Sequence, residues 1–331
     1  MLLNKKQQFS EIVLMIRRSQ YNAIKTVNAE MINLYWNVGK YINKQLKSTK
    51  WGKSVVEELA EYLSQNEPNL KGFSDKNLWR MKQFFETYKD YPKLSPLVRE
   101  ISWTNNLLIF SRSKSIEEMD FYLNMCINER YSKRELDRQI SSGLFERTMI
   151  GSTKRSTVLR EIHPDITNNF KDSYVFEFLT LPKNHDENEL QKGLIGQMKN
   201  FILELGKDFL FIGEEYRVQV GNSDFYIDLL FFHRGLQCLV AFELKADKFK
   251  PEHLGQLNFY LEALDRDVKK SNENPSIGVL LCKDKDIEVV EYALSRYLSP
   301  TMVSEYHTQL PDKKLLQRKL HELFDKDSSI P

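Results

Sequence analysis

The segment FYIDLLFFHRGLQCLVAFELK (residues 225–245) decides the fold of the C-terminal half of the chain. It holds two apolar, β-rich runs, 225–233 and 237–245, separated by the turn residues Arg234 and Gly235, and so predicts two strands of a hairpin. The uninterrupted apolar run 239–242 is typical of a central strand covered on both faces. Asp228, Glu243 and Lys245 interrupt this apolar sequence.

These three charged residues are candidates for a catalytic site. Glu243 and Lys245 lie two apart in a strand and therefore point to the same face. A charge among apolar residues is costly unless a metal or another partner receives it. Phosphodiester hydrolysis needs carboxylates that hold Mg²⁺ and a lysine beside the reacting water. The trio therefore predicts a magnesium-dependent site, and the alternative is a structural Asp228–Lys245 ion pair without catalysis.

The acid-x-lysine pattern also occurs twice elsewhere, at Asp267-Val268-Lys269 and at Asp312-Lys313-Lys314. Both of these lie in polar helical or loop surroundings, where solvated side chains are the simpler interpretation. Only the Glu243 instance ends a buried strand that pairs with a second strand carrying an acid.

The helices predicted on either side of the hairpin supply further candidates. A helix over 187–205 has Glu187 and Glu189 in its first turn, and of the two we favour Glu189 as a third metal ligand. A helix that begins at Pro251 and extends to about residue 264 carries Gln256 and Tyr260 one turn apart on one face. Both are candidate catalytic side chains, and the alternative is a solvated glutamine and a core tyrosine.

Basic residues near the motif are candidates for binding the phosphates that flank the cleaved bond. Lys248, Lys250 and His253 follow the motif, and Arg234 lies in the predicted turn. The alternative is that these side chains are merely solvated.

The remaining elements of the second half predict the order αβββαβα. Strands are expected at 209–220, 276–282 and 302–307, and helices at 287–298 and 313–324. The fold class is therefore α+β, with a mixed-sheet domain over 174–326 in place of a doubly wound one.

The first 150 residues predict an all-helical domain. Apolar residues recur at helical spacing over 9–46. Ser54, Ser115 and Ser132 each precede a glutamate by three residues, which indicates helix starts. Ser74 is expected to cap a helix up to Tyr88. With the preceding helix it forms either a DNA-binding helix-turn-helix or two packed helices, and the connection of about eight residues is long for the former.

The polar, aperiodic stretch 151–173 is the predicted linker between the two domains. With 41% hydrophobic and 28% charged residues, the 331-residue chain has the composition of a soluble globular protein. The net charge of +2 neither demands nor excludes nucleic acid. The three cysteines form no Cys-x-x-Cys pair, and no signal peptide or membrane-spanning stretch is recognised, so we expect a cytoplasmic protein.

Asp228, Glu243-Leu244-Lys245 and the αβββαβ order resemble the PD-(D/E)XK nuclease superfamily, and Gln256-x-x-x-Tyr260 resembles the helix signature of its RecB-like branches. The chain as a whole resembles the YhcG-like family, in which a helical N-terminal domain of unknown function precedes such a nuclease domain. Runs that carry this likeness are YWNVGK (35–40), WGK (51–53), GFS (72–74), MKQF (81–84), SKREL (132–136), LELG (203–206), FYIDLL (225–230) and FKPEH (249–253).

The resemblance implies that Asp228 and Glu243 bind metal, that Lys245 is the catalytic lysine, and that Gln256 and Tyr260 assist. Where the family has a second acid in the first nuclease helix, this chain has Gln191.

We therefore expect a Mg²⁺- or Mn²⁺-dependent endonuclease acting on DNA, in DNA processing, mobile-element biology or defence. RNA and branched or single-stranded DNA are alternative substrates, and a non-catalytic nucleic-acid-binding assembly subunit is the alternative class. Analogy with related nucleases makes a homodimer plausible.

Overall fold

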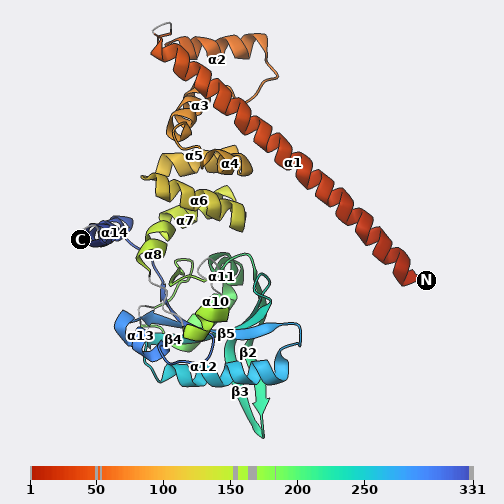
Figure 1. Cartoon of the computed structure of the whole chain (residues 1–331), viewed down its shortest axis with the longest axis vertical. Helices are drawn as coiled ribbons and strands as arrows, with labels where there is room; N and C mark the ends of the chain where they lie inside the picture. The colour runs from red at the N-terminus through yellow and green to blue at the C-terminus, as the bar shows by residue number, and fades with distance from the viewer. Residues whose placement is uncertain are drawn as a thin grey trace. The chain divides into compact units, whose positions relative to one another are not determined.

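A computed structural model describes residues 2–48, 51–52, 54–151, 156–162, 170–182 and 184–327 of the chain. The chain forms two compact units, Met1–Asp137 and Arg138–Pro331 (Figure 1). The domain limits expected from the sequence, 1–150 and 174–326 with a linker at 151–173, stay a prediction. Residues 152–155 and 163–169 of that linker lie outside the described residues.

The first unit is helical throughout its described part, as predicted. Its helices are α1 (Leu2–Lys47), α2 (Ser54–Asn66), α3 (Asp75–Tyr88), α4 (Ser95–Glu100), α5 (Trp103–Arg112), α6 (Ile116–Glu129) and the first residues of α7 (Lys133–Ser141). Three of the serines read as helix starts accept a backbone N–H three residues on: Ser74 from Asn77, Ser115 from Glu118 and Ser132 from Glu135. The capping signals in the sequence therefore set these helix starts correctly.

Helix α1 packs against α3 at close range. A Cβ atom built on Gly39 would lie 2.1 Å from the backbone oxygen of Met81, so only glycine permits this approach. Ile32, Tyr35 and Ile42 lie on the same side of α1 and are buried. The unit's core is thus built on the second half of α1.

The second unit contains a mixed six-stranded sheet with helices on both faces. Its strands are β1 (Ser173–Val175), β2 (Phe209–Val220), β3 (Ser223–His233), β4 (Cys238–Lys248), β5 (Asn274–Asp284) and β6 (Thr301–His307), in the order β1-β6-β5-β4-β3-β2. Its helices are the rest of α7, α8 (Leu144–Ile150), α9 (Thr157–Ile162), α10 (Glu187–Gly196), α11 (Met198–Leu205), α12 (His253–Ala263), the π-helix η2 (Leu264–Val268), α13 (Ile287–Leu294) and α14 (Lys313–Asp327).

Strands β2, β3 and β4 pair antiparallel, whereas β4, β5, β6 and β1 pair parallel. The predicted mixed sheet and α+β class are therefore confirmed. The sequence did not reveal β1, because three residues are too few for a periodic pattern.

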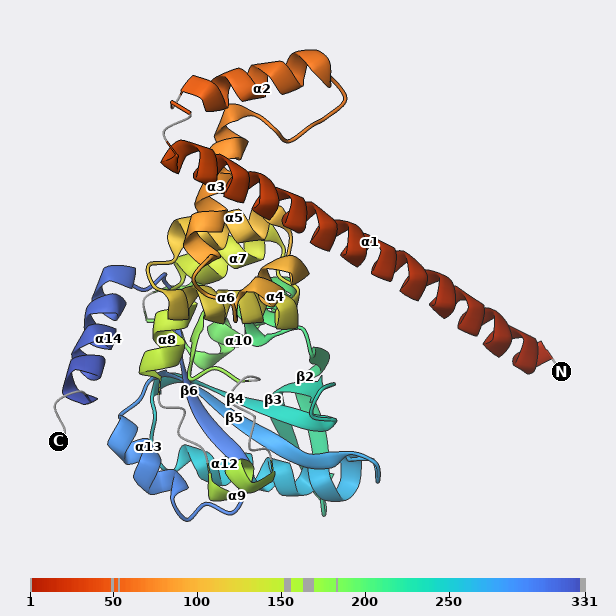
Figure 2. The same ribbon diagram turned by 45° about the horizontal axis from the view of Figure 1, so that its top comes forward.

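Two apolar layers enclose the sheet (Figure 2). On one face, Leu190 and Leu194 of α10 and Phe201 of α11 pack against the strands. On the other, Leu257 of α12 and Val290 of α13 do so. Strand β4 is buried from Cys238 to Leu244, as expected of a central strand.

Two predicted helices were too long. The helix expected over 187–205 is interrupted at Gln197, which leaves the helical region with φ −119° and ψ 31° and separates α10 from α11. Gly193 and Gly196 weaken the helix before the break. The helix expected over 287–298 ends as an α-helix at Leu294.

Within the described residues, none of the helices has the length and hydropathy needed to span a membrane.

Candidate nuclease site

Strands β3 and β4 stop pairing where the two acids begin. The last pair is Leu229 with Phe242, and the next residue along each strand is Asp228 on β3 and Glu243 on β4. From there the side chain of Asp228 takes over, because its Oδ2 accepts the N–H of Leu244 at 2.7 Å. The carbonyl oxygen of Asp228 accepts from Nε2 of Gln191 at 3.1 Å. These two hydrogen bonds give partners to the Leu244 N–H and to the Asp228 carbonyl oxygen beyond the last strand pair. They also fix the position of Asp228.

Glu243 is a buried carboxylate with one oxygen unpaired. Its exposed fraction is 1%, and its Oε1 accepts from Nζ of Lys245 at 2.9 Å. Its Oε2 has no hydrogen-bond partner within the described structure. A buried polar atom without a partner is costly, so an unpaired carboxylate oxygen indicates a site built for a ligand.

The electrostatics of the two acids also favour a cation. Burial raises the pKa of Glu243, and the nearby carboxylate of Asp228 raises it further. Burial likewise raises the pKa of Asp228, against the opposing effect of the Leu244 N–H. The two carboxylates therefore lie within each other's field, and a divalent ion between them would offset both the burial and the repulsion.

A complete protein-only metal cage is absent from the described part of the chain, where no group of three or more His, Cys, Asp or Glu side chains is arranged to hold an ion. Two carboxylates nevertheless fit Mg²⁺, which usually keeps several waters and binds through one or two carboxylates and substrate phosphates.

Lys245 lies beside both glutamates of the site. Its side chain is 12% exposed, and its Nζ is 2.9 Å from Glu243 and 3.3 Å from Glu187. Burial lowers the pKa of Lys245, but Glu243, Glu187 and Asp228 outweigh that effect and the net pKa is raised. The lysine is therefore held as a cation between Glu243 and Glu187.

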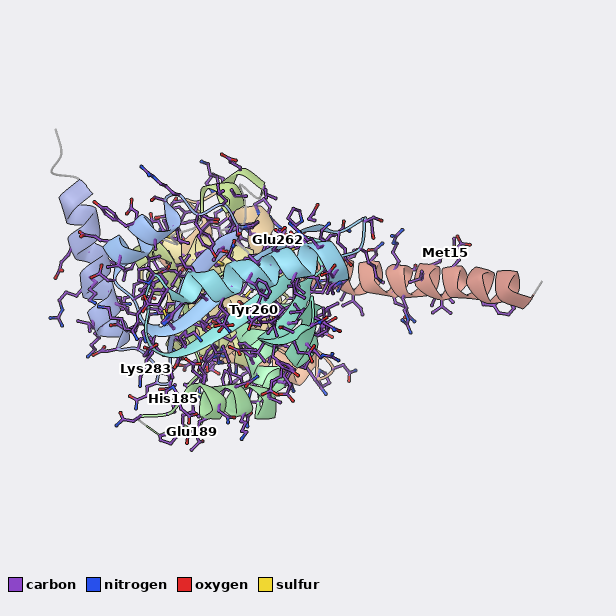
Figure 3. The ribbon with its side chains drawn as sticks, turned by 90° about the horizontal axis from the view of Figure 1, so that it is seen from below. Met15, His185, Glu189, Tyr260, Glu262 and Lys283 are labelled. Carbon is purple, nitrogen blue, oxygen red and sulfur yellow. The ribbon has the colours of Figure 1, made fainter. Side chains whose placement is uncertain are left out.

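Helix α12 brings two further predicted residues to the site. Nε2 of Gln256 donates to the hydroxyl of Tyr260 at 2.7 Å. Tyr260 is 3% exposed and projects from α12 (Figure 3). Burial raises its pKa, and Glu243, Asp228 and Lys245 all act on it electrostatically. Tyr260 thus lies within the field of the trio.

Helix α10 presents Glu187, not Glu189, to the trio. The carboxylate of Glu189 accepts the N–H of Asp186 at 3.0 Å, while Asp186 accepts the N–H of Glu189 at 2.8 Å. These two reciprocal hydrogen bonds form a capping box. The carboxylate of Glu189 (Figure 3), which the sequence favoured as a metal ligand, is therefore hydrogen-bonded at the start of α10. The spacing Asp186-x-x-Glu189 is itself the signal that could have assigned Glu189 to the cap.

Strand β2 adds an acid that the sequence did not reveal. Glu214 pairs with Leu229 and Tyr216 pairs with Ile227, which leaves Glu215 opposite Asp228. Glu215 has φ +42°, a left-handed conformation unusual for a residue other than glycine, and its carboxylate raises the pKa of Asp228. Such backbone strain is frequent at functional sites.

The predicted phosphate-binding residues fall into two places. Lys248, Lys250 and His253 lie where β4 leads into α12, on the side of the site. Lys250 is 2.9 Å from Asp247, and Lys245 acts electrostatically on His253. Arg234 lies in the β3–β4 turn, six residues beyond Asp228, or about 20 Å along the strand. The structure therefore does not bring Arg234 to the trio.

The two other acid-x-lysine sequences lie in helical settings. Asp267 belongs to η2 and is exposed. Asp312 caps α14 by accepting the N–H of Lys314 at 2.9 Å. Neither acid lies in a buried strand as Glu243 does.

Comparison with known proteins gives matches along most of the chain. Residues 167–321 match the YhcG PDDEXK nuclease domain, and residues 11–147 match the DUF1016 N-terminal domain. The Escherichia coli (strain K12) protein "Putative nuclease YhcG" is 30% identical over 346 residues, covering 93% of this chain and 92% of that one. A repair endonuclease from Pyrococcus abyssi, known from its crystal structure, aligns with a TM-score of 0.27 and 17% identity over 39% of this chain and 50% of that one.

Proposed function

The chain belongs to the YhcG-like family of PD-(D/E)XK nucleases, and from this premise we propose that it is a metal-dependent endonuclease that hydrolyses phosphodiester bonds in DNA. The observation that carries the proposal is the buried, unpaired Oε2 of Glu243 beside the half-buried Asp228. Two acids whose pKa values are both raised favour occupation by a cation.

Asp228 and Glu243 would hold the metal, Mg²⁺ or Mn²⁺. When bound, such an ion supplies Lewis acidity at the scissile phosphate and lowers the pKa of water. The bond from the Leu244 N–H orients Asp228, and Lys245 orients Glu243. Of the two acids at the start of α10, the position of Glu187 beside Lys245 favours it over Glu189 as an additional carboxylate.

Lys245 would supply positive charge where negative charge develops on the phosphate during attack. Its ammonium is already held between two carboxylates, so it needs little reorganisation. The Tyr260 hydroxyl and the Gln256 amide form a polar pair on α12 that would orient the substrate or the attacking water.

Lys248, Lys250 and His253 would bind flanking phosphates, since they continue from the motif along β4 and into α12. Arg234, at the far end of the hairpin, would bind only a substrate that extends along it.

The test is cleavage by the purified full-length chain of plasmid, linear and branched DNA and of RNA, with Mg²⁺, Mn²⁺ or chelator. We expect DNA cleavage that requires the metal. Lys245→Ala should lower the rate about 10²–10⁴-fold, and Glu243→Gln should lower it at least as much.

The matched control is the double substitution Asp267→Asn with Lys269→Ala, which removes an acid-x-lysine pair outside the site and should leave the rate unchanged. Cleavage that survives both Glu243→Gln and Lys245→Ala would refute the site. Exclusive cleavage of RNA would change the substrate class. Tight binding without cleavage under every condition would favour a non-catalytic assembly subunit.

A further inference from the structure

Helix α1 carries an exposed apolar face that nothing in the described chain covers. Its first half extends beyond the other helices of its unit (Figure 1). Large apolar side chains recur at spacings of three, four or their multiples, and their exposed fractions run from 37% to 70%: Phe9, Val13, Ile16, Ile24, Val27, Met31 and Leu34. At 100° per residue they fall within about a quarter of the circumference. A contiguous apolar face of this length marks an interaction surface.

This face differs from the side of α1 that packs within its own unit. The packed side holds Ile32, Tyr35 and Ile42, which are buried. Its centre is turned by roughly 80° from the centre of the exposed face, again at 100° per residue. One helix therefore has two apolar faces, and within the part of the chain that the structure describes only one of them is packed.

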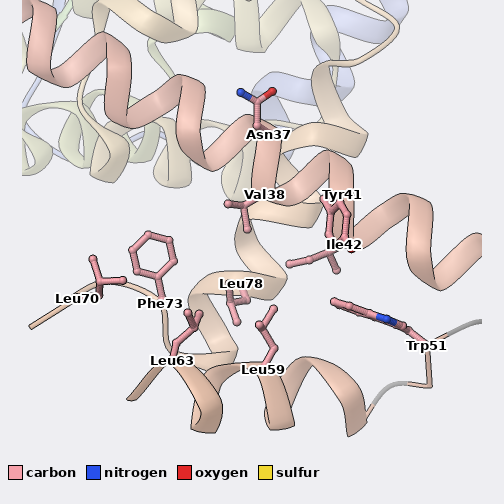
Figure 4. Close-up of a pocket in the computed structure, with 10 residues that line it drawn as sticks. All are labelled: Asn37, Val38, Tyr41, Ile42, Trp51, Leu59, Leu63, Leu70, Phe73 and Leu78. Atoms are coloured by element: carbon pink, nitrogen blue, oxygen red, sulfur yellow. The ribbon is translucent and has the colours of Figure 1, made fainter. Parts of the chain in front are cut away.

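The exposed face leads into an apolar cavity at the other end of α1. The cavity has a volume of about 560 Å³ and is lined by residues of α1, of α2 and of the segment that follows α2 (Figure 4). Val38 and Tyr41, which continue the exposed face, line it from α1, and Leu59 and Leu63 line it from α2. Both a projecting apolar ridge and an apolar cavity that could receive one thus lie on the same face.

Charge also divides along this surface. Helix α1 carries eight lysines and arginines and two glutamates, with Arg17 and Arg18 in its projecting half. Helix α2, beside the cavity, carries Glu57, Glu58 and Glu61 and no basic residue. The projecting half of α1 is therefore complementary in charge to the helix that borders the cavity.

We propose that two copies of the chain associate through antiparallel α1 helices, so that the projecting half of each helix enters the cavity of the other copy. With Val27 at the two-fold axis, Val13 of one copy lies level with Tyr41 of the other. This register spans 28 residues, or about 42 Å of helix. Ile12, Val13 and Ile16 approach the cavity, and Arg17, about 65° from the centre of the exposed face at 100° per residue, approaches the acidic α2.

A second copy fits better than another occupant for two reasons. The same face supplies both ridge and cavity, so a two-fold arrangement covers both copies at once and leaves no open end. A parallel pair would set the basic first halves of α1 side by side, whereas the antiparallel pair sets each against the acidic α2 of the other copy.

The first test is analytical ultracentrifugation of the full-length chain over a range of concentrations. We expect a dimer. Val27→Glu places two carboxylates at the axis and should weaken dimerisation at least about 100-fold. The matched control is Met15→Glu, since Met15 and Val27 are both 68% exposed on α1 and Met15 lies 120° around the helix from Val27, at 100° per residue. We expect Met15→Glu to remain a dimer.

The second test is disulfide cross-linking, which determines which residues of the two α1 helices lie opposite each other. Cys126, Cys238 and Cys282 are buried and unpaired, so an added cysteine reports on its own position. Val27→Cys should cross-link to itself across the axis. Val13→Cys should cross-link only when mixed with Tyr41→Cys, because antiparallel helices keep the two Val13 positions apart.

A wild-type chain that stays monomeric at the highest concentration would overturn the proposal. Equal dissociation by Met15→Glu, or a dimer that is insensitive to Val27→Glu, would overturn it too. Homotypic cross-linking of Val13→Cys would show a parallel pair. Monomers that bind nucleic acid or an acidic protein through α1 would replace the second copy by another occupant. None of these readouts depends on nuclease activity.

Discussion

Glu204 and Glu243, two of the buried glutamates of the second unit, have opposite surroundings. Glu204, at 0% exposure, accepts from Arg138 at 2.7 Å, from Gln139 at 3.3 Å and from the Val175 N–H at 3.1 Å. Nζ of Lys171 lies 3.2 Å from Oε1 of Glu204, the oxygen that also accepts from Val175. Glu243, at 1% exposure, has a single lysine on one oxygen and no described partner on the other.

The pKa values record this difference. Burial would raise the pKa of Glu204, but Lys171, Arg147 and Arg138 outweigh burial and lower it to about 2. At Glu243 burial is reinforced by Asp228, and Lys245 does not offset the two effects, so the pKa is raised.

The comparison separates a structural carboxylate from one held ready for a ligand. Glu204 is fully satisfied by the chain itself and ties α7, α11 and β1 together. Glu243 leaves negative charge uncompensated where the strands separate. Burial alone therefore does not distinguish the two carboxylates, whereas the unpaired oxygen of Glu243 beside a second acid does.

The largest expected effect is the loss of stability on substituting Glu204. Glu204→Gln leaves Arg138, Arg147 and Lys171 without their shared anion and should cost about 3–5 kcal/mol. The expected fall in melting temperature is about 6–20 °C. The same isosteric change at Glu243 is the control, and it should cost less than about 1 kcal/mol because it removes a buried charge with one unpaired oxygen and leaves Lys245 paired with Glu187. Calorimetry of both variants measures this, and equal losses would contradict the distinction.

Lowering the pH should remove the stabilising contribution of the Glu204 carboxylate. The folded pKa of Glu204 is lowered to about 2, so its contribution is complete above the unfolded value near 4.5 and is lost as the pH falls toward 2. The shift corresponds to about 3 kcal/mol in full, of which about 2 kcal/mol is lost by pH 3. Urea unfolding at pH 5.5 and pH 3 should therefore show a smaller pH effect in Glu204→Gln than in the wild type. An identical pH effect would contradict the prediction.

Mg²⁺ should raise the free energy of unfolding by binding at Glu243 and Asp228. Binding at a concentration 100 times the dissociation constant adds about 2.7 kcal/mol, or about 5–11 °C in melting temperature. Glu243→Gln and Asp228→Asn should abolish this increment, whereas Glu204→Gln should keep it on a lower baseline. Thermal unfolding with Mg²⁺ and with chelator measures it, and an increment that persists without Glu243 would place the metal elsewhere.

The smallest effect separates the two acids of α10. Glu189→Gln weakens the capping box and should lower stability by about 0.5–1 kcal/mol without changing the Mg²⁺ increment. Glu187→Gln should change stability by less than about 0.5 kcal/mol and reduce the Mg²⁺ increment. The paired measurement is denaturant unfolding with and without Mg²⁺, and the reverse outcome would restore Glu189 as the metal ligand.

The sequence by itself determined the element order and predicted the trio that we propose as the centre of the site. Apolar runs of strand length, the turn at Arg234-Gly235 and the Ser-x-x-Glu caps are local signals, so they placed the helices and the β2–β4 strands within a few residues. The two-residue spacing of Glu243 and Lys245 fixes their shared face because strand side chains alternate. Asp228, Glu243 and Lys245 could be singled out because they interrupt apolar runs.

Only the tertiary structure decided which partners the acids have. Whether a buried carboxylate meets cations, as Glu204 does 33 residues from Lys171, depends on contacts that no local period encodes. The same holds for Glu187 beside Lys245, Glu215 opposite Asp228, the three-residue β1 and the uncovered face of α1. The capping box at Glu189 is likewise a tertiary observation, because a glutamate that caps a helix and one that binds a metal are the same residue type in the sequence.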